Sequence, residues 1–556
     1  MIKILKNTLA VVTPTEKKEF SRLILLDIFI SLVDILSIAF LLWIIQFYIQ
    51  PEKNISIAFL PAWLTDKHSM MLIAAFVLLF AIKNWIGFLI SKATLKFIGR
   101  VAVRISANNL ASYQQAAFCE FIKTDSSAHV RTIAFQPFDL SQYMLAGIQQ
   151  MVTQLSLITI SIVAIILFNA TLFLLLLLIL LPPAFTSFYL IKKRQLIART
   201  NIQQHNERSF QYLLDSLKGY VEANIYNRND FFLQRFVGAR EKFSTNLFDS
   251  LALQGLPNRI IEIFAVLGLF ILIAIARWTG NNDSATLITI GAFMAAAYKI
   301  IPGIVKVINI SGQMKAYSSS FHEITTDKKT IRQPAEQEQS EELSSIKFNN
   351  IDFNYGDQAV LKKLSFEICK GDFIGITGAS GKGKTSIFNL LLGFLPAAKG
   401  NIFFNGKPVS NIEIKNYWPR IAYVRQQNFF IHDSLLRNIT LEEKTSKEEN
   451  LQYAVLYSGL EKIIAQFPEG PGKIITENGK NISGGQQQRV NIARALYKRA
   501  GLILLDEPFN ELDDEAVHSL LKHFRELAET GTTVVMITHD KESLAYCNKI
   551  ISLDEA

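Results

Sequence analysis

The stretch Gly378-Ala-Ser-Gly-Lys-Gly-Lys-Thr385 carries glycines and lysines at a recognisable spacing. It matches the phosphate-binding loop pattern G-x-x-x-x-G-K-[ST] at every fixed position. The apolar run from Phe373 to Thr377 precedes it and a helical stretch begins at Ser386, so the loop joins a strand to a helix. Glycines let the backbone curve around a phosphate, and the helix N-terminus points N–H groups at it. The sequence therefore predicts a nucleotide-binding domain.

Two side chains of this loop are expected to act on the bound nucleotide. Lys384 would neutralise the outer phosphates of ATP, and the hydroxyl of Thr385 would hold Mg²⁺. The remaining residues predicted to bind phosphate are Gly378, Ser380, Gly381, Lys382, Gly383 and Ser386.

The segment 346–556 alternates strand-like and helical runs. The strand-like runs are Phe373–Thr377, Ile421–Val424, Leu502–Leu505, Val534–Ile537 and Ile550–Leu553. Such alternation is typical of an α/β domain with a mainly parallel core sheet. The charged, polar stretch that precedes it, 321–345, is predicted to be a linker.

Polar residues that follow two of these strands are candidates for catalysis. Asp506 ends a buried run, where a Mg²⁺-binding acid belongs beside a phosphate loop. Glu507, the next residue, can polarise the water that attacks the γ-phosphate. His539 follows another buried strand and can contact the γ-phosphate or that water.

A second glycine-containing helix start lies in Ile482-Ser-Gly-Gly-Gln-Gln-Gln-Arg489. The helix predicted from Gln487 to Lys498 would offer a second site for an anion. One domain does not need two such sites for one triphosphate. Two copies packed head to tail could each close over the nucleotide of the other, which predicts a dimer.

The first half of the chain is apolar enough for a membrane protein. The hydrophobic fraction is 50% and the mean hydropathy is +0.23, with the apolar residues gathered before about residue 315. A helix needs about 20 residues to cross a bilayer. The candidate spans are Leu23–Tyr48, Met70–Ile90, Gln149–Phe168, Thr171–Ile191, Ile260–Ala276 and Ala285–Ile310. They predict a six-helix membrane domain over 23–320.

Loop length and charge predict the orientation of these spans. The segments near Ser91–Ile148 and Lys192–Arg259 are long and basic, whereas the loops on the opposite side are short. Basic loops favour the cytoplasmic side. The net charge of +9 is therefore attributed to cytoplasmic loops and not to nucleic-acid binding. We expect a multi-pass membrane protein with a cytoplasmic nucleotide-binding domain.

Charged residues inside the predicted spans have two interpretations. They are Asp27, Asp34, Lys83, Glu262, Lys299 and Lys306. Buried charges are costly unless they are paired or hydrated. They could line a polar cavity for a charged cargo group, or they could form ion pairs between helices and snorkel to the surface. The segment 1–22 likewise has two interpretations, an amphipathic helix on the inner membrane surface or a frayed tail.

Together these features resemble an ATP-binding cassette (ABC) exporter with fused membrane and nucleotide-binding domains. The resemblance implies an α-helical six-span membrane domain of ABC exporter type, followed by an α/β P-loop NTPase domain. It also implies a location in the bacterial inner membrane. By this resemblance Tyr355 would stack on adenine, and Gln426 would touch Mg²⁺ and sense the membrane domain. The signature motif, acting in trans, would comprise Ser483, Gly484, Gly485 and Gln486, and His539 would be the switch histidine.

The resemblance also implies contact segments and shows a departure. Coupling helices are expected near Ser126–Val130 and Tyr226–Phe231. The D-loop reads Asn510-Glu-Leu-Asp513, with Asn510-Glu511 where such exporters usually carry Ser-Ala. All predicted catalytic residues are nevertheless present, which favours two competent ATP sites in a homodimer.

The expected function is ATP hydrolysis coupled to export or lipid flipping by alternating access. A lipid-linked glycan or another amphipathic lipid is the expected cargo, and a heterodimer is left open. One alternative is an exporter of a small antimicrobial peptide or a drug-like compound. A further alternative is an ATP-gated channel or regulator, since fold-level analogy does not fix function.

Overall fold

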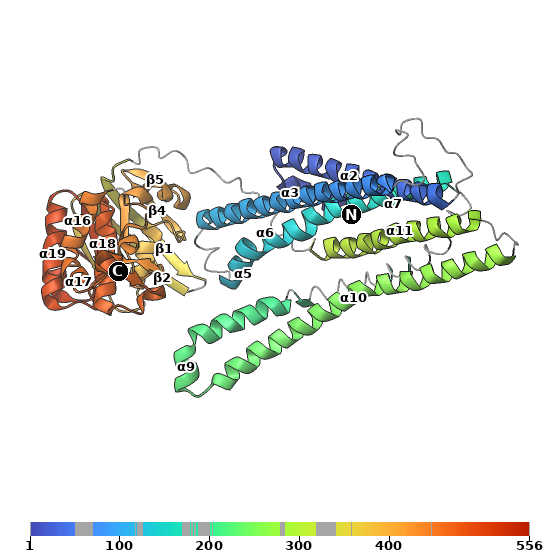
Figure 1. The fold of residues 1–556 in the computed structure, drawn as a ribbon. Coiled ribbons are helices and arrows are strands. Elements are labelled where there is room, and N and C mark those ends of the chain that lie inside the picture. The colour runs from blue at the N-terminus through green and yellow to red at the C-terminus, as the bar shows by residue number, and fades with distance from the viewer. Residues whose placement is uncertain are drawn as a thin grey trace. The chain divides into compact units, whose positions relative to one another are not determined.

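A computed structural model describes most of the chain. The described residues are 2–49, 70–116, 126–168, 201–278, 284–317 and 341–554, apart from positions 203, 357 and 446, together with a few isolated positions between 118 and 189. The chain divides into two compact units (Figure 1). Unit 1 comprises Met1–Ala116 and Thr124–Ile331, and unit 2 comprises Ala117–Lys123 and Arg332–Ala556.

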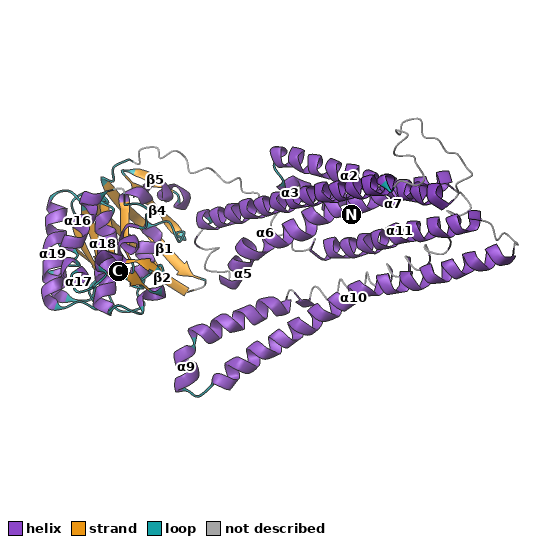
Figure 2. Cartoon of the chain, viewed as in Figure 1, coloured by secondary structure: helices purple, strands orange, loops and turns teal. Residues whose placement is uncertain are grey.

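The described part of unit 1 is helical (Figure 2). Its α-helices are α1 (Ile2–Val11), α2 (Pro14–Ile49), α3 (Met71–Gln115), α5 (Ser126–Val130), α6 (Gln136–Asp139), α7 (Ala146–Phe168), α9 (Tyr220–Ile225), α10 (Asn229–Trp278) and α11 (Ser284–Tyr317). Two π-helical segments, η1 (Arg131–Phe135) and η2 (Leu140–Leu145), flank α6. Helix α2 packs against α3 and α7, and α11 packs against α7 and α10.

The long helices of unit 1 extend well beyond the thickness of a membrane. Helix α3 has 45 residues, which at 1.5 Å per residue is about 68 Å, whereas a bilayer core is about 30 Å thick. Among the described residues, four helices are long and apolar enough to cross a membrane. The first, second, third, fifth and sixth predicted spans fall on α2, α3, α7, α10 and α11. The fourth, Thr171–Ile191, lies outside the described residues apart from isolated positions.

The N-terminal helix is packed into unit 1. Leu5, Leu9 and Val11 contact the hydrophobic cluster that α2, α3 and η2 share. Arg104 of α3 pairs with Glu16 at 2.7 Å and donates to the carbonyl oxygen of Val11 at 3.0 Å. These contacts favour an ordered helix over a frayed tail, and its location on the membrane surface stays a prediction.

Three of the charged residues in the predicted spans are paired between helices. Lys83 of α3 is buried and forms an ion pair with Asp34 of α2. Gln149 of α7 donates to the carboxylate of Asp27 and, at 3.1 Å, to the hydroxyl of Thr94. Since polar groups in lipid must be satisfied inside the bundle, this network favours the structural interpretation for Asp27, Asp34 and Lys83.

The other three charged residues remain open to either interpretation. Glu262 and Lys306 are exposed in the single chain. Glu262 lies 3.9 Å from Arg259 on the same helix. The side chain of Lys299 lies outside the described residues. A cargo-facing role for Glu262, Lys299 and Lys306 stays a prediction.

Unit 2 is built on a five-stranded parallel sheet. The strand order is β11-β3-β10-β9-β6. The strands are β3 (Phe373–Thr377), β6 (Ile421–Val424), β9 (Leu502–Asp506), β10 (Thr533–Ile537) and β11 (Lys549–Ser552). The ends of these strands differ from the predicted ends by at most one residue. The α/β domain with a parallel core sheet is therefore confirmed.

A second sheet in unit 2 is antiparallel and has the order β2-β1-β4-β5. Its strands are β1 (Ser345–Tyr355), β2 (Gln358–Cys369), β4 (Lys399–Phe404) and β5 (Lys407–Val409). The short strands β7 (Asp433–Ser434) and β8 (Ile474–Ile475) pair separately. None of the strands of this antiparallel sheet is among those predicted from the sequence above.

Helices cover the parallel sheet and complete its core. They are α13 (Lys384–Leu391), α14 (Asn411–Ile414), α15 (Leu435–Thr440), α16 (Glu448–Tyr457), α17 (Glu461–Ile464), α18 (Gly484–Tyr497), α19 (Asp514–Glu529) and α20 (Lys541–Leu544). Successive strand residues point to opposite faces. Ile374 and Leu504 therefore join the cluster that includes α13 and the antiparallel sheet. Phe373 and Leu505 join the cluster that includes α18 and α19.

The register of the parallel sheet brings the predicted catalytic segments to one edge. In β10, Ile537 pairs with Ile376 of β3 and with Asp506 of β9. Carboxyl ends of parallel strands share an edge of the sheet, which is where ligands bind in such folds. The phosphate loop after β3, Glu507 after β9 and His539 after β10 therefore lie at the same edge.

Candidate functional site

The phosphate loop has the backbone that its glycines predict. Gly383 precedes α13 in a left-handed conformation with a φ of 88°. A Cβ atom at this position would lie 2.7 Å from Val360 Cγ1, so both the backbone and the space require glycine. Ser380, Gly381 and Lys382 form the exposed crest of the loop, whereas Ser386 is buried in α13.

Lys384 lies inside the curve of this loop. Its Nζ donates to the carbonyl oxygen of Gly378 at 2.7 Å and to that of Ala379 at 3.1 Å. The ammonium group is therefore held where the loop backbone would surround a phosphate. An anion placed there would meet the positive charge of Lys384 and the N-terminus of α13 together.

Asp506 is an inaccessible carboxylate at the end of β9. It is 2% exposed, accepts a hydrogen bond from the Tyr423 hydroxyl at 3.3 Å and is hydrogen bonded to Thr385. Burial raises the pKa of Asp506, and the neighbouring charge of Glu507 raises it further. A divalent cation would offset both effects. The oxygen donors Thr385, Asp506 and Gln426 fit the oxygen preference of Mg²⁺.

Glu507 has a strained backbone conformation, and its carboxylate accepts hydrogen bonds from two side-chain amides. Its φ is +49°, a region that costs a non-glycine residue roughly 1–3 kcal/mol and is common at active sites. Its N–H donates to the carbonyl of Ile537 at 3.0 Å. Its Oε2 accepts from Gln426 Nε2 at 2.7 Å and from Asn510 Nδ2 at 3.1 Å. Sequence reasoning missed Asn510 as a partner, although its departure from the usual D-loop was a signal.

The second glycine-containing helix start is capped by its own side chains. The Ser483 hydroxyl accepts from the N–H of Gln486 at 3.3 Å, and Gln486 Oε1 accepts from the N–H of Ser483 at 3.1 Å. This capping box starts α18 at Gly484. Ser483 and Gln486 are therefore both engaged in the helix cap, and Gly484 and Gly485 begin the first turn of α18.

The rings of two predicted site residues, Tyr355 and His539, are exposed. Tyr355 ends β1, is 51% exposed and meets the ring of Phe353 edge-on at 4.8 Å. His539 is exposed directly after β10. Both rings are therefore accessible to a ligand or to a second chain.

A short segment that follows α3 belongs to unit 2. Residues 117–123 cluster with unit 2, whereas the predicted coupling segment Ser126–Val130 forms α5 of unit 1. Phe118, which the structure describes, stacks on Phe394 with ring centroids 4.6 Å apart. Phe394 in turn meets Trp418 edge-on at 5.6 Å. A coupling role for Ser126–Val130 stays a prediction.

Comparison with known families accounts for both units. The profile described as ABC transporter matches residues 361–510, and that described as ABC transporter transmembrane region matches residues 22–297. The chain belongs to the ABC transporter family. Its two-part fold, a helical membrane domain of exporter type and an ABC nucleotide-binding domain, confirms the resemblance predicted from the sequence.

Two curated relatives of this ABC transporter are distant in sequence. It is 27% identical over 356 residues to an ATP-dependent lipid A-core flippase of Burkholderia orbicola, covering 63% of this chain and 59% of that protein. It is 25% identical over 351 residues to a probable ABC transporter ATP-binding/permease protein of Haemophilus influenzae, covering 62% of each. The match thus spans about three fifths of the length of these relatives.

A solved structure shares the fold over nearly the whole chain. The ATP-bound structure of a bacterial Atm1-family ABC exporter superposes with a TM-score of 0.76 and 20% sequence identity. The alignment covers 97% of this ABC transporter and 93% of that exporter. This likeness shows a common fold.

Proposed function

We propose that two copies of this chain form a membrane exporter that hydrolyses ATP and works by alternating access. The proposal rests on two helix N-termini in unit 2, each suited to bind an anion. The start of α13 carries the phosphate loop, and the start of α18 carries Ser483-Gly484-Gly485. In a head-to-tail dimer each ATP would lie between the phosphate loop of one copy and the α18 start of the other. ATP would then favour the closed dimer, because only that form contacts it from both sides.

The chemistry is assigned to residues at the carboxyl edge of the parallel sheet. Lys384 and the N-terminus of α13 would bind the phosphates, and Thr385, Asp506 and Gln426 would hold Mg²⁺, which neutralises charge on the transferred phosphate. The carboxylate of Glu507 would accept the proton of the attacking water. Gln426 and Asn510 orient that carboxylate through Oε2. His539 is exposed and would contact the γ-phosphate.

The turn between α9 and α10 suits a coupling contact. Ile225 is 74% exposed and Tyr226 is 72% exposed at this turn. Exposed apolar side chains that gather on a polar loop mark an interaction surface. We assign this turn as the second coupling segment, as the sequence predicted for Tyr226–Phe231, with a nucleotide-binding domain as its partner.

Replacing Asn510 by alanine is expected to lower the rate of ATP hydrolysis. The carboxylate of Glu507 would keep Gln426 as a donor but lose the bond from Asn510. We expect kcat to fall about tenfold with KM for ATP nearly unchanged, because a hydrogen bond to a charged group is worth about 1.5 kcal/mol. Steady-state ATPase assays of the purified dimer measure both constants. Asn411→Ala on α14 is the matched control and should retain parent kinetics.

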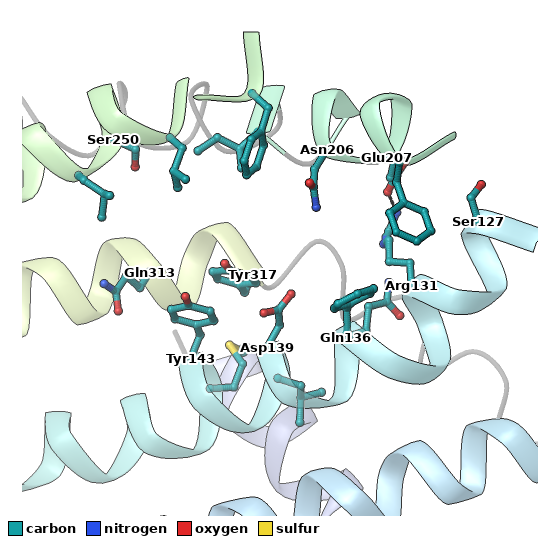
Figure 3. A pocket seen from close by; sticks show the side chains of 18 of the residues that line it. Ser127, Arg131, Gln136, Asp139, Tyr143, Asn206, Glu207, Ser250, Gln313 and Tyr317 are labelled. Atoms are coloured by element: carbon teal, nitrogen blue, oxygen red, sulfur yellow. Dashed lines mark ion pairs between the residues drawn. The ribbon is translucent and has the colours of Figure 1, made fainter. Parts of the chain in front are cut away.

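Unit 1 contains a cavity suited to the polar part of a cargo. Its volume is about 470 Å³, and its walls come from the α5–η2 segment, the helix over 204–218, α10 and α11 (Figure 3). Arg131 and Glu207 form an ion pair across it. Tyr143 stacks on Tyr317 with centroids 4.0 Å apart, and Asp139 lies beside them. The two π-helical segments form part of this wall, and such segments are frequent at functional sites.

The lining of the cavity favours an amphipathic cargo with a polyhydroxyl head. Amide side chains from Gln136, Asn206, Gln254 and Gln313 alternate with aromatic faces such as Phe210. Ligand pockets combine apolar surface with a few placed polar groups that fix orientation. A lipid-linked glycan would offer hydroxyls to the amides and sugar faces to the rings, and flippase relatives are consistent with a lipid cargo. A small peptide is the second candidate, since Asp139 and the Arg131–Glu207 pair could meet its termini.

Replacing Tyr143 by alanine is expected to weaken cargo binding without loss of the basal ATPase. The cargo would lose the ring of Tyr143, which lines the cavity, and an aromatic contact is worth about 1 kcal/mol. We expect the cargo concentration that half-maximally stimulates ATP hydrolysis to rise about fivefold. Phe138→Ala is the control, because Phe138 is on α6 but does not line the cavity. Equal shifts in both variants would contradict a cargo role for this cavity.

Transport itself is tested in proteoliposomes. A fluorescent lipid-linked glycan should move between leaflets only with ATP, and Glu507→Gln should abolish that movement. ATP-dependent uptake of a labelled peptide, with no movement of the glycan, would select the peptide exporter. ATP-gated ion current without movement of either cargo would select a channel and refute export.

A further inference from the structure

The side chain of Glu511 lies on the first turn of α18. A Cβ atom built on Gly484 would stand 2.7 Å from Glu511 Oε2 and 3.1 Å from its Cδ. A Cβ atom on Gly485 would stand 2.7 Å from the carbonyl oxygen of Glu511. The two glycines therefore leave the space that Glu511 occupies. A carboxylate is thus placed against the helix start at which a phosphate is proposed to bind.

The residues after Glu511 hold it in this position. Asp513 accepts a hydrogen bond from Arg489 of α18 at 3.3 Å and caps α19 by accepting from the N–H of Ala516 at 2.8 Å. The side chain of Leu512 packs against the core cluster under α18 and α19. The backbone at Glu511 is therefore tied to both helices, while its side chain remains exposed.

The location of this carboxylate has an electrostatic consequence. The first N–H groups of a helix have no partner within the helix, and together they carry a partial positive charge that attracts anions. Glu511 supplies an anion from within the same chain. A second anion that approached Gly484 would meet the negative charge of Glu511 and would have to displace it.

We propose that Glu511 is an internal competitor of ATP and sets the ATP concentration at which the dimer closes. The proposal rests on the function proposed above, in which the α18 start of one copy receives the γ-phosphate bound to the other. In the resting chain Glu511 covers Gly484. Closure of the dimer displaces the carboxylate. The free energy of this displacement lowers the affinity of the dimer for ATP. An uncharged residue at this position would remove the competition.

Glu511→Gln tests this role, because it removes the charge and keeps the shape. In the full-length dimer in lipid nanodiscs, we expect KM for ATP to fall about threefold, the order of effect of one charge at a helix terminus, with kcat not reduced. Glu511→Asp keeps the charge, and its KM for ATP should lie between that of the parent and that of Glu511→Gln. Glu529→Gln removes the same charge from the far end of α19 and should leave KM unchanged.

The alternative is that Glu511 only stabilises the start of α18. In that case Glu511→Gln would lower the melting temperature and leave KM unchanged or raised, and the competitor role would be refuted. An equal fall of KM in Glu529→Gln would also refute it, because net charge would then be the cause. A parent protein without ATPase activity would instead refute the proposed function, so the two failures are distinguishable.

Discussion

Replacing Glu507 by glutamine is expected to lower ATP turnover about a thousandfold, the middle of the range for loss of a general base. Glutamine has nearly the shape of glutamate but cannot accept the proton of the attacking water. Lys384, Thr385 and Asp506 would be unchanged, so ATP should still bind. Because hydrolysis is what reopens the dimer in the proposed cycle, the variant should accumulate as a closed dimer with bound ATP. Bound nucleotide and ATPase rate, measured on the same sample, check both parts.

The control for this variant is a nearby glutamate that is more exposed than Glu507 and lies outside the proposed site. Glu515 lies in the first turn of α19 and is exposed. Glu515→Gln should hydrolyse ATP at nearly the parent rate. Parent-like turnover in Glu507→Gln would exclude Glu507 as the catalytic base, and the strained backbone at +49° would then need another explanation.

Replacing Lys384 by alanine is expected to abolish ATP binding at concentrations that saturate the parent. The ammonium group lies inside the phosphate loop, 2.7 Å from the carbonyl oxygen of Gly378. Its loss removes a charge-assisted contact to the phosphates and weakens ATP binding about a hundredfold, since such contacts are worth up to about 3 kcal/mol each. Equilibrium binding of a fluorescent ATP analogue measures the change. Tight binding in this variant would contradict the assignment of the loop.

Two further variants separate a loss of charge from a distortion of the loop. Lys384→Arg keeps the positive charge and should bind ATP more tightly than Lys384→Ala. Lys399→Ala on β4 removes an exposed lysine elsewhere in unit 2 and should bind ATP as the parent does. Together, Glu507→Gln and Lys384→Ala should give opposite phenotypes, a trapped complex in one case and no complex in the other.

The sequence predicts the parts of the site that are continuous along the chain. The phosphate loop, the pair Asp506-Glu507 and the start of α18 are each local, because a few neighbouring residues define both the backbone and the chemistry. The edge of the sheet that unites them follows from strand order, since parallel strands end on one side. The matching register of Ile376, Asp506 and Ile537 bears this out.

The contacts between these parts could not be predicted in the same way. The side chain of Gln426 reaches Glu507 across 81 positions of the sequence. Glu511 reaches Gly484 from a separate turn, and only the packing of α18 against the segment after β9 brings them together. Such pairs depend on the exact angles of packed helices, which no local pattern encodes. The sequence showed that Asn510 and Glu511 are unusual in the D-loop, but it did not show which residues they contact.

In the membrane half, too, the sequence predicts the local elements but not the contacts between them. Apolar runs of sufficient length predicted α2, α3, α7, α10 and α11, because the cost of exposing a backbone in lipid enforces helices there. Which charges pair was not determined by spacing alone. Asp34 could have faced lipid, cargo or a neighbour, and its pairing with Lys83 is a property of how α2 packs on α3.

By itself, the sequence determined that this ABC transporter has membrane-spanning helices followed by a nucleotide-binding α/β domain, since hydrophobic runs and glycine spacing act over short distances. The tertiary structure alone decided which groups surround Glu507, where Glu511 rests and which side chains line the cavity beside Asp139. These arrangements arise when distant segments pack together, because close packing converts small differences in helix position into specific contacts.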